Sequence, residues 1–213
     1  ISMGSETVFS SISTYYTAVS FDSTSNQVLI TYNASSQGKA LMGTISGTSL
    51  SLGSEATYTT NNSYIMSSAF NLNANKAVVT FRDDGNSNYA TSVIGTVSGT
   101  SISFGTPSVL ASEYGEGNAN ASAYNPTTQS VFTGVAFTSG GKLVPITNSG
   151  TSVVVGTMIP VSTQFAYTDV NYIPDGDLVS VSYRGADSHG NITIYGSSTN
   201  LTATNFVGIT DEA

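Results

Sequence analysis

The sequence predicts an all-β fold built from repeats of about fifty residues, and three observations predict it. The phrase Gly-Thr-Ile-Ser-Gly-Thr-Ser-Leu-Ser at 43–51 returns at 95–103 with two conservative changes. On both sides of its Ser-Gly-Thr turn, apolar residues alternate with Ser or Thr, which is the periodicity of β-strands. Charged residues make up only 8% of the chain, which fits strands with uncharged, hydroxyl-rich faces.

The first expected strand of each repeat ends in an aromatic or apolar residue and leads into a turn rich in Asn, Asp, Ser and Pro. These residues favour turns because Asn and Asp bond to nearby backbone and Pro presets its own φ angle. The expected first strands are 18–22, 67–71, 121–125 and 169–173.

The second expected strand is the most apolar of each repeat, with a nearly continuous run of β-branched and aromatic residues. Such a run is typical of a strand that is buried on both faces. The expected second strands are 28–32, 77–81, 131–137 and 178–183.

The third expected strand follows a polar loop that contains Gly or Asn, and the fourth carries the pattern apolar-Ser-apolar-Gly. The third strands are expected at 39–45, 89–97, 142–147 and 191–196. The fourth strands are expected at 50–53 and 102–105, with a variant at 153–156 and a degenerate copy at 201–208.

Four short antiparallel strands at this period are typical of a β-propeller blade. We therefore predict a β-propeller-like fold of four such repeats with an extra N-terminal strand; the alternative is a linear β-repeat array. Within a single repeat domain, 1–213, the predicted divisions are an orphan outer strand at 1–12 and repeats at 13–61, 62–113, 114–164 and 165–213.

The opening Ile1-Ser2-Met3-Gly4 has the fourth-strand pattern but no preceding three strands. An exposed strand edge tends to pair with another strand. We expect this segment to close the last blade of its own chain or to add a strand to a neighbouring chain. Because the chain opens on Ile, we also expect it to derive from a longer precursor. The residues expected to make the pairing are Ile1, Met3, Val8 and Phe9.

Composition excludes several classes of function. The net charge is −8 and only five residues are basic, which excludes a nucleic-acid-binding patch. No apolar run reaches the length of a membrane-spanning helix. There is no Cys, which excludes disulfides, thiolate metal sites and Cys nucleophiles.

Enzymatic chemistry finds little support in the residues. His189 is the only histidine, so neither a Ser-His-Asp triad nor a histidine metal cluster is indicated. Propeller glycosidases of the sialidase kind use three arginines, whereas only Arg82 and Arg184 are present. Other glycosidases need two carboxylates, and nothing selects a pair among the 13 Asp and Glu residues. We predict no enzyme, no catalytic residue and no cofactor.

The loops between second and third strands are the most polar parts of the chain. The loop 82–88 offers oxygen ligands for Ca²⁺ at Asp83, Asp84 and Asn86, although its spacing is not that of an EF-hand. The alternative is a solvated loop with an Arg–Asp pair. Four tyrosines near the starts of first strands either stack on sugar rings or pack in the core or at the rim: Tyr15, Tyr16, Tyr64 and Tyr114.

Five Asn-X-Ser/Thr sequons provide candidate glycosylation acceptors for a secreted protein. The candidate acceptors are Asn33, Asn61, Asn120, Asn191 and Asn200.

The segment 93–107, after Val78-Val79-Thr80-Phe81-Arg82-Asp83, resembles tandem β-repeats of large tail-fibre and surface proteins from aquatic phages and bacteria. The closing phrase 204–209 also resembles a phrase that ends such repeat blocks. The resemblance implies an extracellular, cell-surface or virion-surface setting and carries over no catalytic residue.

From these observations we predict a non-enzymatic structural or adhesive subunit of an extracellular or virion fibre-type assembly. Closure or polymerisation through its N-terminal strand would build that assembly. The expected partners are other copies of the chain, as a homo-oligomer or filament, or other repeats of a longer chain, with surface glycans as a further partner. The alternatives are a lectin-like, glycan-binding head and a propeller-fold glycosidase.

Overall fold

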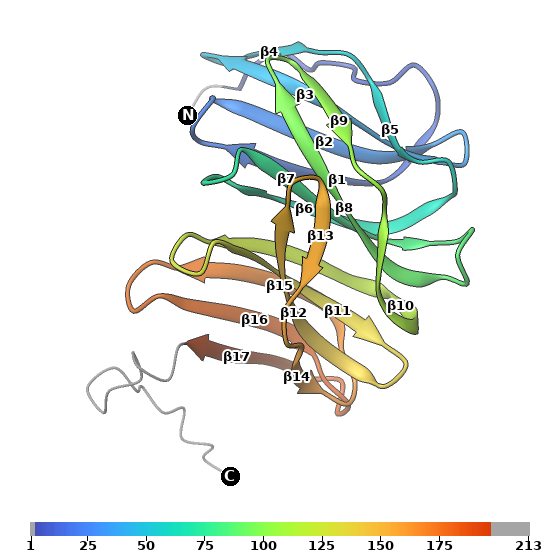
Figure 1. Ribbon diagram of the computed structural model, residues 1–213, viewed down its shortest axis with the longest axis vertical. Helices are drawn as coiled ribbons and strands as arrows, with labels where there is room; N and C mark the ends of the chain where they lie inside the picture. The colour runs from blue at the N-terminus through green and yellow to red at the C-terminus, as the bar shows by residue number, and fades with distance from the viewer. Residues whose placement is uncertain (1–2, 197–213) are drawn as a thin grey trace.

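The computed structural model describes residues 3–196. Over this range the chain forms strands, turns and irregular segments, with no helix (Figure 1). Without a helix, this part of the chain also has no helical segment fit to cross a membrane. The prediction of an all-β fold is confirmed.

The first sheet is antiparallel and follows the order of the chain, with one additional strand beside its third member. Its turn between second and third strands is a tight hairpin in which Ser35 and Ser36 have positive φ angles of 51° and 59°. Its strands are β1 (Thr14–Asp22), β2 (Gln27–Ala34), β3 (Gln37–Ser46), β4 (Ser49–Leu52) and β5 (Ala56–Thr59), the last paired with β3.

The second sheet contains nine strands because β10 joins two groups: its first part pairs with β8 and its last part with β11. All pairings in it are antiparallel. Its strands are β6 (Ser63–Asn71), β7 (Lys76–Asp83), β8 (Tyr89–Ser98), β9 (Ser101–Phe104), β10 (Ser108–Asn125), β11 (Ser130–Phe137), β12 (Gly140–Ser149), β13 (Ser152–Val155) and β14 (Ile159–Ser162).

The third sheet has three antiparallel strands in chain order. They are β15 (Ala166–Ile173), β16 (Leu178–Arg184) and β17 (Gly190–Gly196).

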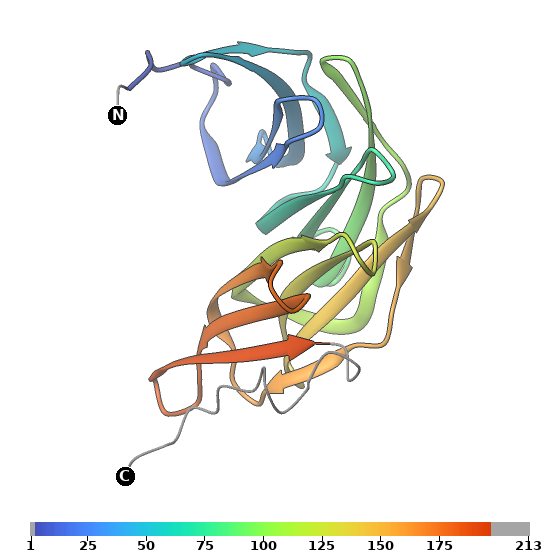
Figure 2. The ribbon, with the colours of Figure 1, turned by 90° about the vertical axis from the view of Figure 1, so that its left-hand side faces the viewer.

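The strands β1, β6, β10 and β15 lie next to one another across the molecule. Hydroxyl pairs join them, with Ser68 Oγ donating to Ser20 Oγ at 2.9 Å and Ser67 Oγ lying 2.8 Å from Ser122 Oγ. Figure 2 shows the strand groups fanning outward from this line in an open arc. Neighbouring blades of a β-propeller are arranged in this way. The prediction of a β-propeller-like, all-β architecture is therefore confirmed in its general form.

Apolar cores lie between successive strand groups, which explains the continuous apolar runs. In β7, Val78 belongs to the core shared with β10–β13, and its neighbour Val79 belongs to the core shared with the first sheet. Both side chains are fully buried. In β16, Val179 and Val181 pack with Leu143 and Phe165 in a third core. β7 is therefore buried on two faces, as its sequence predicts, whereas Val179 and Val181 of β16 lie on one face and share one core.

A break in register interrupts β1, β6 and β15 near their starts and β10 near its middle, between Gly115 and Asn120. In three of them a residue other than glycine has a left-handed backbone: Tyr16 (φ 51°), Ile65 (φ 49°) and Tyr167 (φ 52°). This conformation is costly for side chains with a Cβ, above all for a β-branched one. A bulge of this kind changes which way the adjoining side chains point.

Glycines fix the spacing between successive hairpins. A Cβ on Gly53 would lie 1.8 Å from the carbonyl oxygen of Thr100 in the next Ser-Gly-Thr turn, and one on Gly105 would lie 2.2 Å from that of Thr151. Since Cβ atoms do not approach that closely, only glycine fits there. We call these approaches the glycine–turn contacts. Gly53 and Gly105 also donate backbone hydrogen bonds to strands β3 and β8.

The N-terminal segment differs from the predicted orphan strand. Residues 3–12 form no strand; Gly4 instead makes a glycine–turn contact with Thr48, its Cβ position 2.0 Å from the Thr48 carbonyl oxygen. The Phe9 ring packs on Tyr32 with centroids 5.1 Å apart. Met3 and Val8 are exposed, and Ile1 lies outside the described residues. The segment is held by these side-chain and glycine contacts, with no strand ladder in residues 3–12.

Candidate functional site

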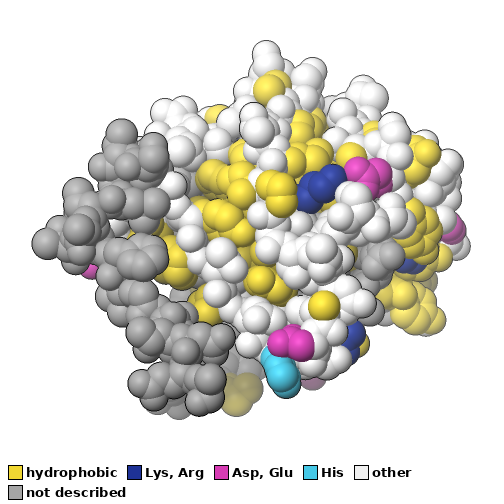
Figure 3. Space-filling model, turned by 90° about the horizontal axis from the view of Figure 1, so that it is seen from below, with side chains coloured by type: hydrophobic (Ala, Val, Ile, Leu, Met, Phe, Trp, Pro, Cys, Tyr) yellow, Lys and Arg dark blue, Asp and Glu magenta, His cyan; other side chains and the backbone are white. Residues whose placement is uncertain are grey.

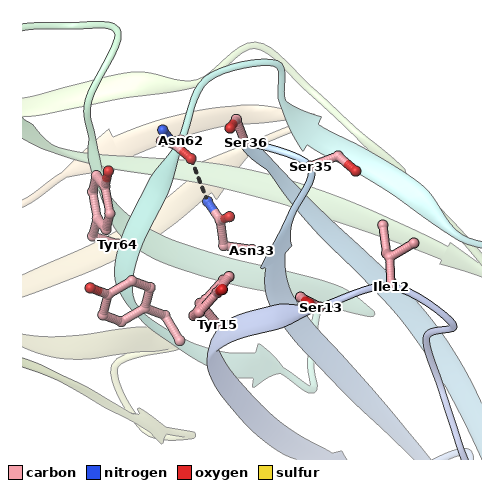
Figure 4. A pocket seen from close by; sticks show the side chains of 9 residues that line it. Ile12, Ser13, Tyr15, Asn33, Ser35, Ser36, Asn62 and Tyr64 are labelled. Carbon is pink, nitrogen blue, oxygen red and sulfur yellow. Dashed lines mark hydrogen bonds between the residues drawn. The ribbon is translucent and has the colours of Figure 1, made fainter.

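A cleft of about 510 Å³ opens where the first sheet meets the start of β6 (Figure 4). Its walls come from the residues before and within β1, the end of β2, the β2–β3 turn and the approach to β6. We call it the tyrosine cleft. Its lining residues are Ile12, Ser13, Tyr15, Tyr16, Asn33, Ser35, Ser36, Asn62 and Tyr64.

Three tyrosines form the aromatic part of the tyrosine cleft. The Tyr16 and Tyr64 rings meet edge to face, with centroids 5.2 Å apart and planes at 83°. Because the backbone bulges at Tyr16, Tyr15 and Tyr16 are both exposed, at 61% and 48%, instead of alternating between core and solvent. Exposed rings with polar tips are the groups that bind ligands having one apolar face and one polar edge.

Amides and hydroxyls form the polar part. Asn33 is buried at the end of β2, and its Nδ2 donates to Asn62 Oδ1 at 3.3 Å and to the carbonyl oxygen of Ser63 at 3.1 Å. These bonds tie the β2 end to the approach to β6 (Figure 4). Ser35 and Ser36 are placed at the edge by the tight turn.

Arg82 supports the tyrosine wall from behind. Its guanidinium carbon lies 4.6 Å from the centroid of the Tyr64 ring and 5.6 Å from that of Tyr114. Cation–π attraction therefore holds Tyr64 between Arg82 and Tyr16. The Arg82 Nε is buried and has no hydrogen-bond partner within the described part of the chain. The predicted Arg–Asp pair does not form there.

The same arrangement recurs at the other end of the arc. Arg184, at the end of β16, lies with its guanidinium carbon 4.9 Å from the centroid of the Tyr167 ring. Tyr167 is exposed at 64% and, like Tyr16, has a left-handed backbone. Tyr167 was not among the candidate site residues of the sequence. It occupies the same place in the fourth repeat as Tyr16 does in the first, and this match could have identified it.

The candidate calcium loop is held by internal hydrogen bonds. Asp83 is buried, and its Oδ1 accepts from Asn61 Nδ2 at 2.8 Å and from the Gly85 backbone N–H at 3.1 Å. Asp84 Oδ2 accepts from Asn62 Nδ2 at 3.4 Å, while Asn86 is exposed. Between residues 3 and 196 no group of three or more His, Cys, Asp or Glu side chains is arranged to hold a metal.

His189 lies in the exposed β16–β17 loop, away from the lining of the tyrosine cleft. Its Nδ1 is 2.8 Å from Asp187 Oδ2, and Figure 3 shows the histidine at the surface against an acidic side chain. The pKa of Asp187 lies below its ordinary value, because the His189 backbone N–H and then its imidazole hydrogen-bond the carboxylate. Within residues 3–196, no Ser or Thr hydroxyl hydrogen-bonds to Asp187 or His189.

Four of the five sequon asparagines lie in the described residues, and their side-chain amides are used by the fold. Asn33 donates to Asn62 and Ser63, and Asn61 donates to Asp83. Asn120 Nδ2 donates to the Ile65 carbonyl oxygen at the β6 bulge, and Asn191 Nδ2 donates to that of His189. Asn200 lies outside the described residues.

The structure brings the four candidate tyrosines together. Tyr15, Tyr16 and Tyr64 line the cleft, and Tyr114 joins them through Arg82. The sequence named Asn33 only as a sequon and did not indicate its hydrogen bond to Asn62, because that bond joins two segments that meet only in the folded chain.

The fold resembles solved structures, although no family model and no curated protein matches the sequence. A protein from Lactobacillus plantarum superposes with a TM-score of 0.53 at 10% identity, over 84% of this chain and 54% of its own. The NanB sialidase of Streptococcus pneumoniae gives 0.58 at 15% identity, over 89% of this chain and 31% of its own. The chain spans about half of the first protein and under a third of the second.

An α-L-arabinofuranosidase from Podospora anserina gives a TM-score of 0.43 at 12% identity, over 90% of this chain and 66% of its own, too low to bear on the fold.

These comparisons correct the predicted function. The prediction of a non-enzymatic structural or adhesive fibre subunit is wrong, because the fold is similar to that of an enzyme, the NanB sialidase. The prediction that the chain is no enzyme is wrong for the same reason. At 15% identity the likeness shows the fold alone, so the activity is argued from the site.

Proposed function

We propose that the tyrosine cleft binds a neutral sugar and that the chain is the glycan-recognising part of a carbohydrate-active, propeller-like protein. One observation carries the proposal: exposed Tyr15 and Tyr16 and half-buried Tyr64 share one cleft with amide and hydroxyl side chains. The fold shared with a sialidase supports the link to carbohydrates. The strand groups β1–β4, β6–β9, β10–β13 and β15–β17 are then four blades of the arc.

The chemistry of a sugar ring fits these walls. One face of a pyranose presents C–H groups, which pack on the flat, electron-rich face of a tyrosine ring. Its hydroxyls lie around the edge and both donate and accept hydrogen bonds. Asn62, Ser35 and Ser36 offer amide and hydroxyl partners at the rim of the tyrosine cleft. A few placed polar groups beside aromatic walls are typical of small-ligand sites.

The absence of charge in the lining favours a neutral sugar. The described residues that line the tyrosine cleft include no Asp, Glu, Lys or Arg. A charged group that left water for this cleft would lose hydration without gaining a partner of opposite charge. A neutral hexose carries no charge and therefore needs no partner of opposite charge in the cleft.

Cleavage of a glycoside needs two carboxyl groups about 5–9.5 Å apart. In the described part of the chain, the carboxylate bonded to the tyrosine cleft is that of Asp84, through Asn62. We therefore assign sugar binding to the cleft and include a hydrolysis measurement in the test.

The test is a glycan array with neutral and sialylated glycans, followed by calorimetric titration of the best ligand. We expect neutral glycans to bind, and Tyr15→Ala or Tyr64→Ala to weaken binding about tenfold or more, equivalent to about 1.4 kcal/mol. The matched control is Phe21→Ala, which removes an exposed ring from the opposite end of β1. Release of reducing sugar from the bound glycan is measured in parallel.

Two results would contradict the proposal: no neutral glycan binds, or Tyr15→Ala and Phe21→Ala bind the ligand equally well. Thermal unfolding of each variant shows whether its fold is kept. Tyr15 and Phe21 are both exposed, so Tyr15→Ala and Phe21→Ala are expected to keep the fold, whereas Tyr64 is half-buried and its variant is interpreted only if it unfolds like the wild type.

A further inference from the structure

A second cavity of about 290 Å³ adjoins the tyrosine cleft, and Tyr16 lines both. Residues of β1, β6, β10 and β15 line it, so it lies where the first strands of the four groups meet. We call it the axial cavity. Its lining residues are Tyr16, Thr17, Ile65, Met66, Asn120, Tyr167 and Thr168.

The three left-handed residues of the first strands all line the axial cavity. Tyr16, Ile65 and Tyr167 lie on three different strands, each at the register break of its strand. Asn120 reaches across from β10 and donates to the Ile65 carbonyl oxygen, which holds the bulge of β6 in place. Strained backbone that the surrounding structure holds in place gathers at ligand sites more often than elsewhere.

The axial cavity repeats the chemistry of the tyrosine cleft. In the cleft, Tyr64 is backed by Arg82; in the axial cavity, Tyr167 is backed by Arg184, with the guanidinium 4.9 Å from the ring centroid. Tyr16 lines both the tyrosine cleft and the axial cavity, so it connects the wall formed by Tyr64 with the wall formed by Tyr167. The cavity lining contains no charged side chain among the described residues, as in the cleft.

A polar group in this wall also lacks a partner. The Thr168 Oγ1 is buried and makes no hydrogen bond to any described residue. Buried hydroxyls are normally paired with protein, water or ligand. This oxygen has almost no accessible surface, so a sugar hydroxyl bonds it only if the Thr168 side chain turns toward the cavity.

We infer that the axial cavity is a second sugar subsite, so that the chain binds a neutral glycan of two or more residues across Tyr16. The inference rests on the proposed sugar binding in the tyrosine cleft. One ring stacks in the cleft beside Tyr64, and the next ring along the glycan stacks on Tyr167. Tyr16 contacts both rings and sets the direction in which the glycan runs.

The test compares the monosaccharide, disaccharide and trisaccharide of the best neutral ligand by titration calorimetry, with NMR chemical-shift changes for the weakest binder. We expect the disaccharide to bind about tenfold more tightly than the monosaccharide. Tyr167→Ala should remove that gain and leave monosaccharide affinity unchanged, whereas Tyr64→Ala should weaken both. Tyr167→Phe keeps the ring and should restore the gain, and Phe21→Ala should change neither.

The outcomes separate the two proposals. If the monosaccharide binds but the disaccharide binds no more tightly, or if Tyr167→Ala keeps the full gain, the second subsite is wrong and the cleft proposal stands. If no neutral sugar of any length binds, both are wrong. Tyr167 is exposed at 64%, so its replacement is not expected to unfold the chain.

Discussion

At the scale of single residues, Glu55 links two strands of the first sheet to the β4–β5 connection. Its Oε1 lies 2.5 Å from Lys39 Nζ, and its Oε2 accepts a hydrogen bond from the Tyr32 hydroxyl. The hydrogen bond from Lys39, followed by that from Tyr32, lowers the pKa of Glu55 below its ordinary value. Burial, with Glu55 beside it, raises the pKa of Tyr32 above its ordinary value.

Because the folded-state pKa of Glu55 is lowered, its ion pair stabilises the fold above the unfolded-state pKa and is lost as pH falls through the folded-state value. We expect Glu55→Gln to reduce the free energy of unfolding at pH 7 by about 0.5–1 kcal/mol, the range for a partly exposed pair. The difference should shrink as pH is lowered from 7 toward 3, because the carboxylate becomes protonated as pH falls through its lowered folded-state pKa. Urea unfolding at both pH values measures it.

The control for this prediction is Glu6→Gln, since Glu6 forms no ion pair within residues 3–196. A loss of stability that is equal at pH 7 and pH 3 would show that Glu55 acts through packing and not through charge.

At the scale of elements, the hairpins meet their neighbours through backbone at the glycine–turn contacts. Gly53 ends β4 and lies against the turn at Thr100 before β9. A side chain there would push directly against a carbonyl oxygen, which has no rotamer by which to move aside.

We therefore expect Gly53→Ala to reduce the free energy of unfolding by about 1–3 kcal/mol, the usual cost of overpacking. The matched control is Gly190→Ala, because a Cβ on Gly190 meets nothing within 4 Å. Guanidinium unfolding compares the two variants. Equal stability of both variants would mean that the contact is not as close as the structure places it.

The elements also show what a sequence of this kind reveals. Alternation of apolar and hydroxyl residues predicts the hairpins, and continuous runs such as Ala77–Phe81 predict the doubly buried strands. The bulges are not predictable in this way, because an isoleucine such as Ile65 has no intrinsic preference for a left-handed backbone. Packing between the four first strands imposes that conformation. The length of β10 likewise follows from pairing with two partners.

The candidate site was predictable only in part. Its tyrosines could be named because exposed aromatic residues cluster near the starts of first strands. Asn33 appeared only as a sequon, yet it is buried and bonded to Asn62 on another strand group. Its role depends on a contact between residues 29 positions apart. The predicted fibre function rested on missing catalytic motifs and on local phrases, whereas the likeness to a sialidase fold that overturns it lies in how whole strand groups are arranged.

At the scale of the whole molecule, stability is divided among cores that lie between successive strand groups. Val79 belongs to the core between the first sheet and β6–β9, whereas Val181 belongs to the core against β15–β17. Each is fully buried, and the two cores share no residue. Mutations in cores without common neighbours act independently.

We expect Val79→Ala and Val181→Ala each to reduce the free energy of unfolding by about 2–3 kcal/mol. The double variant should lose the sum of the two within about 0.5 kcal/mol. Urea unfolding of the two single variants and the double variant measures this. Strong non-additivity would contradict this prediction. It would show that the two cores are energetically coupled or that unfolding is not a single two-state transition.

The glycine–turn contacts have a consequence for how such a molecule changes its length. The three contacts have nearly the same geometry, with Gly4 against Thr48, Gly53 against Thr100 and Gly105 against Thr151. Successive hairpins therefore make the same kind of contact. The stretch between two of these glycines forms one unit. If such a unit were duplicated or deleted, the glycine–turn contacts on either side of it could still form in the same register. We therefore expect the arc to tolerate the gain or loss of whole units of this kind, which would change its span in fixed steps and leave each remaining contact unchanged.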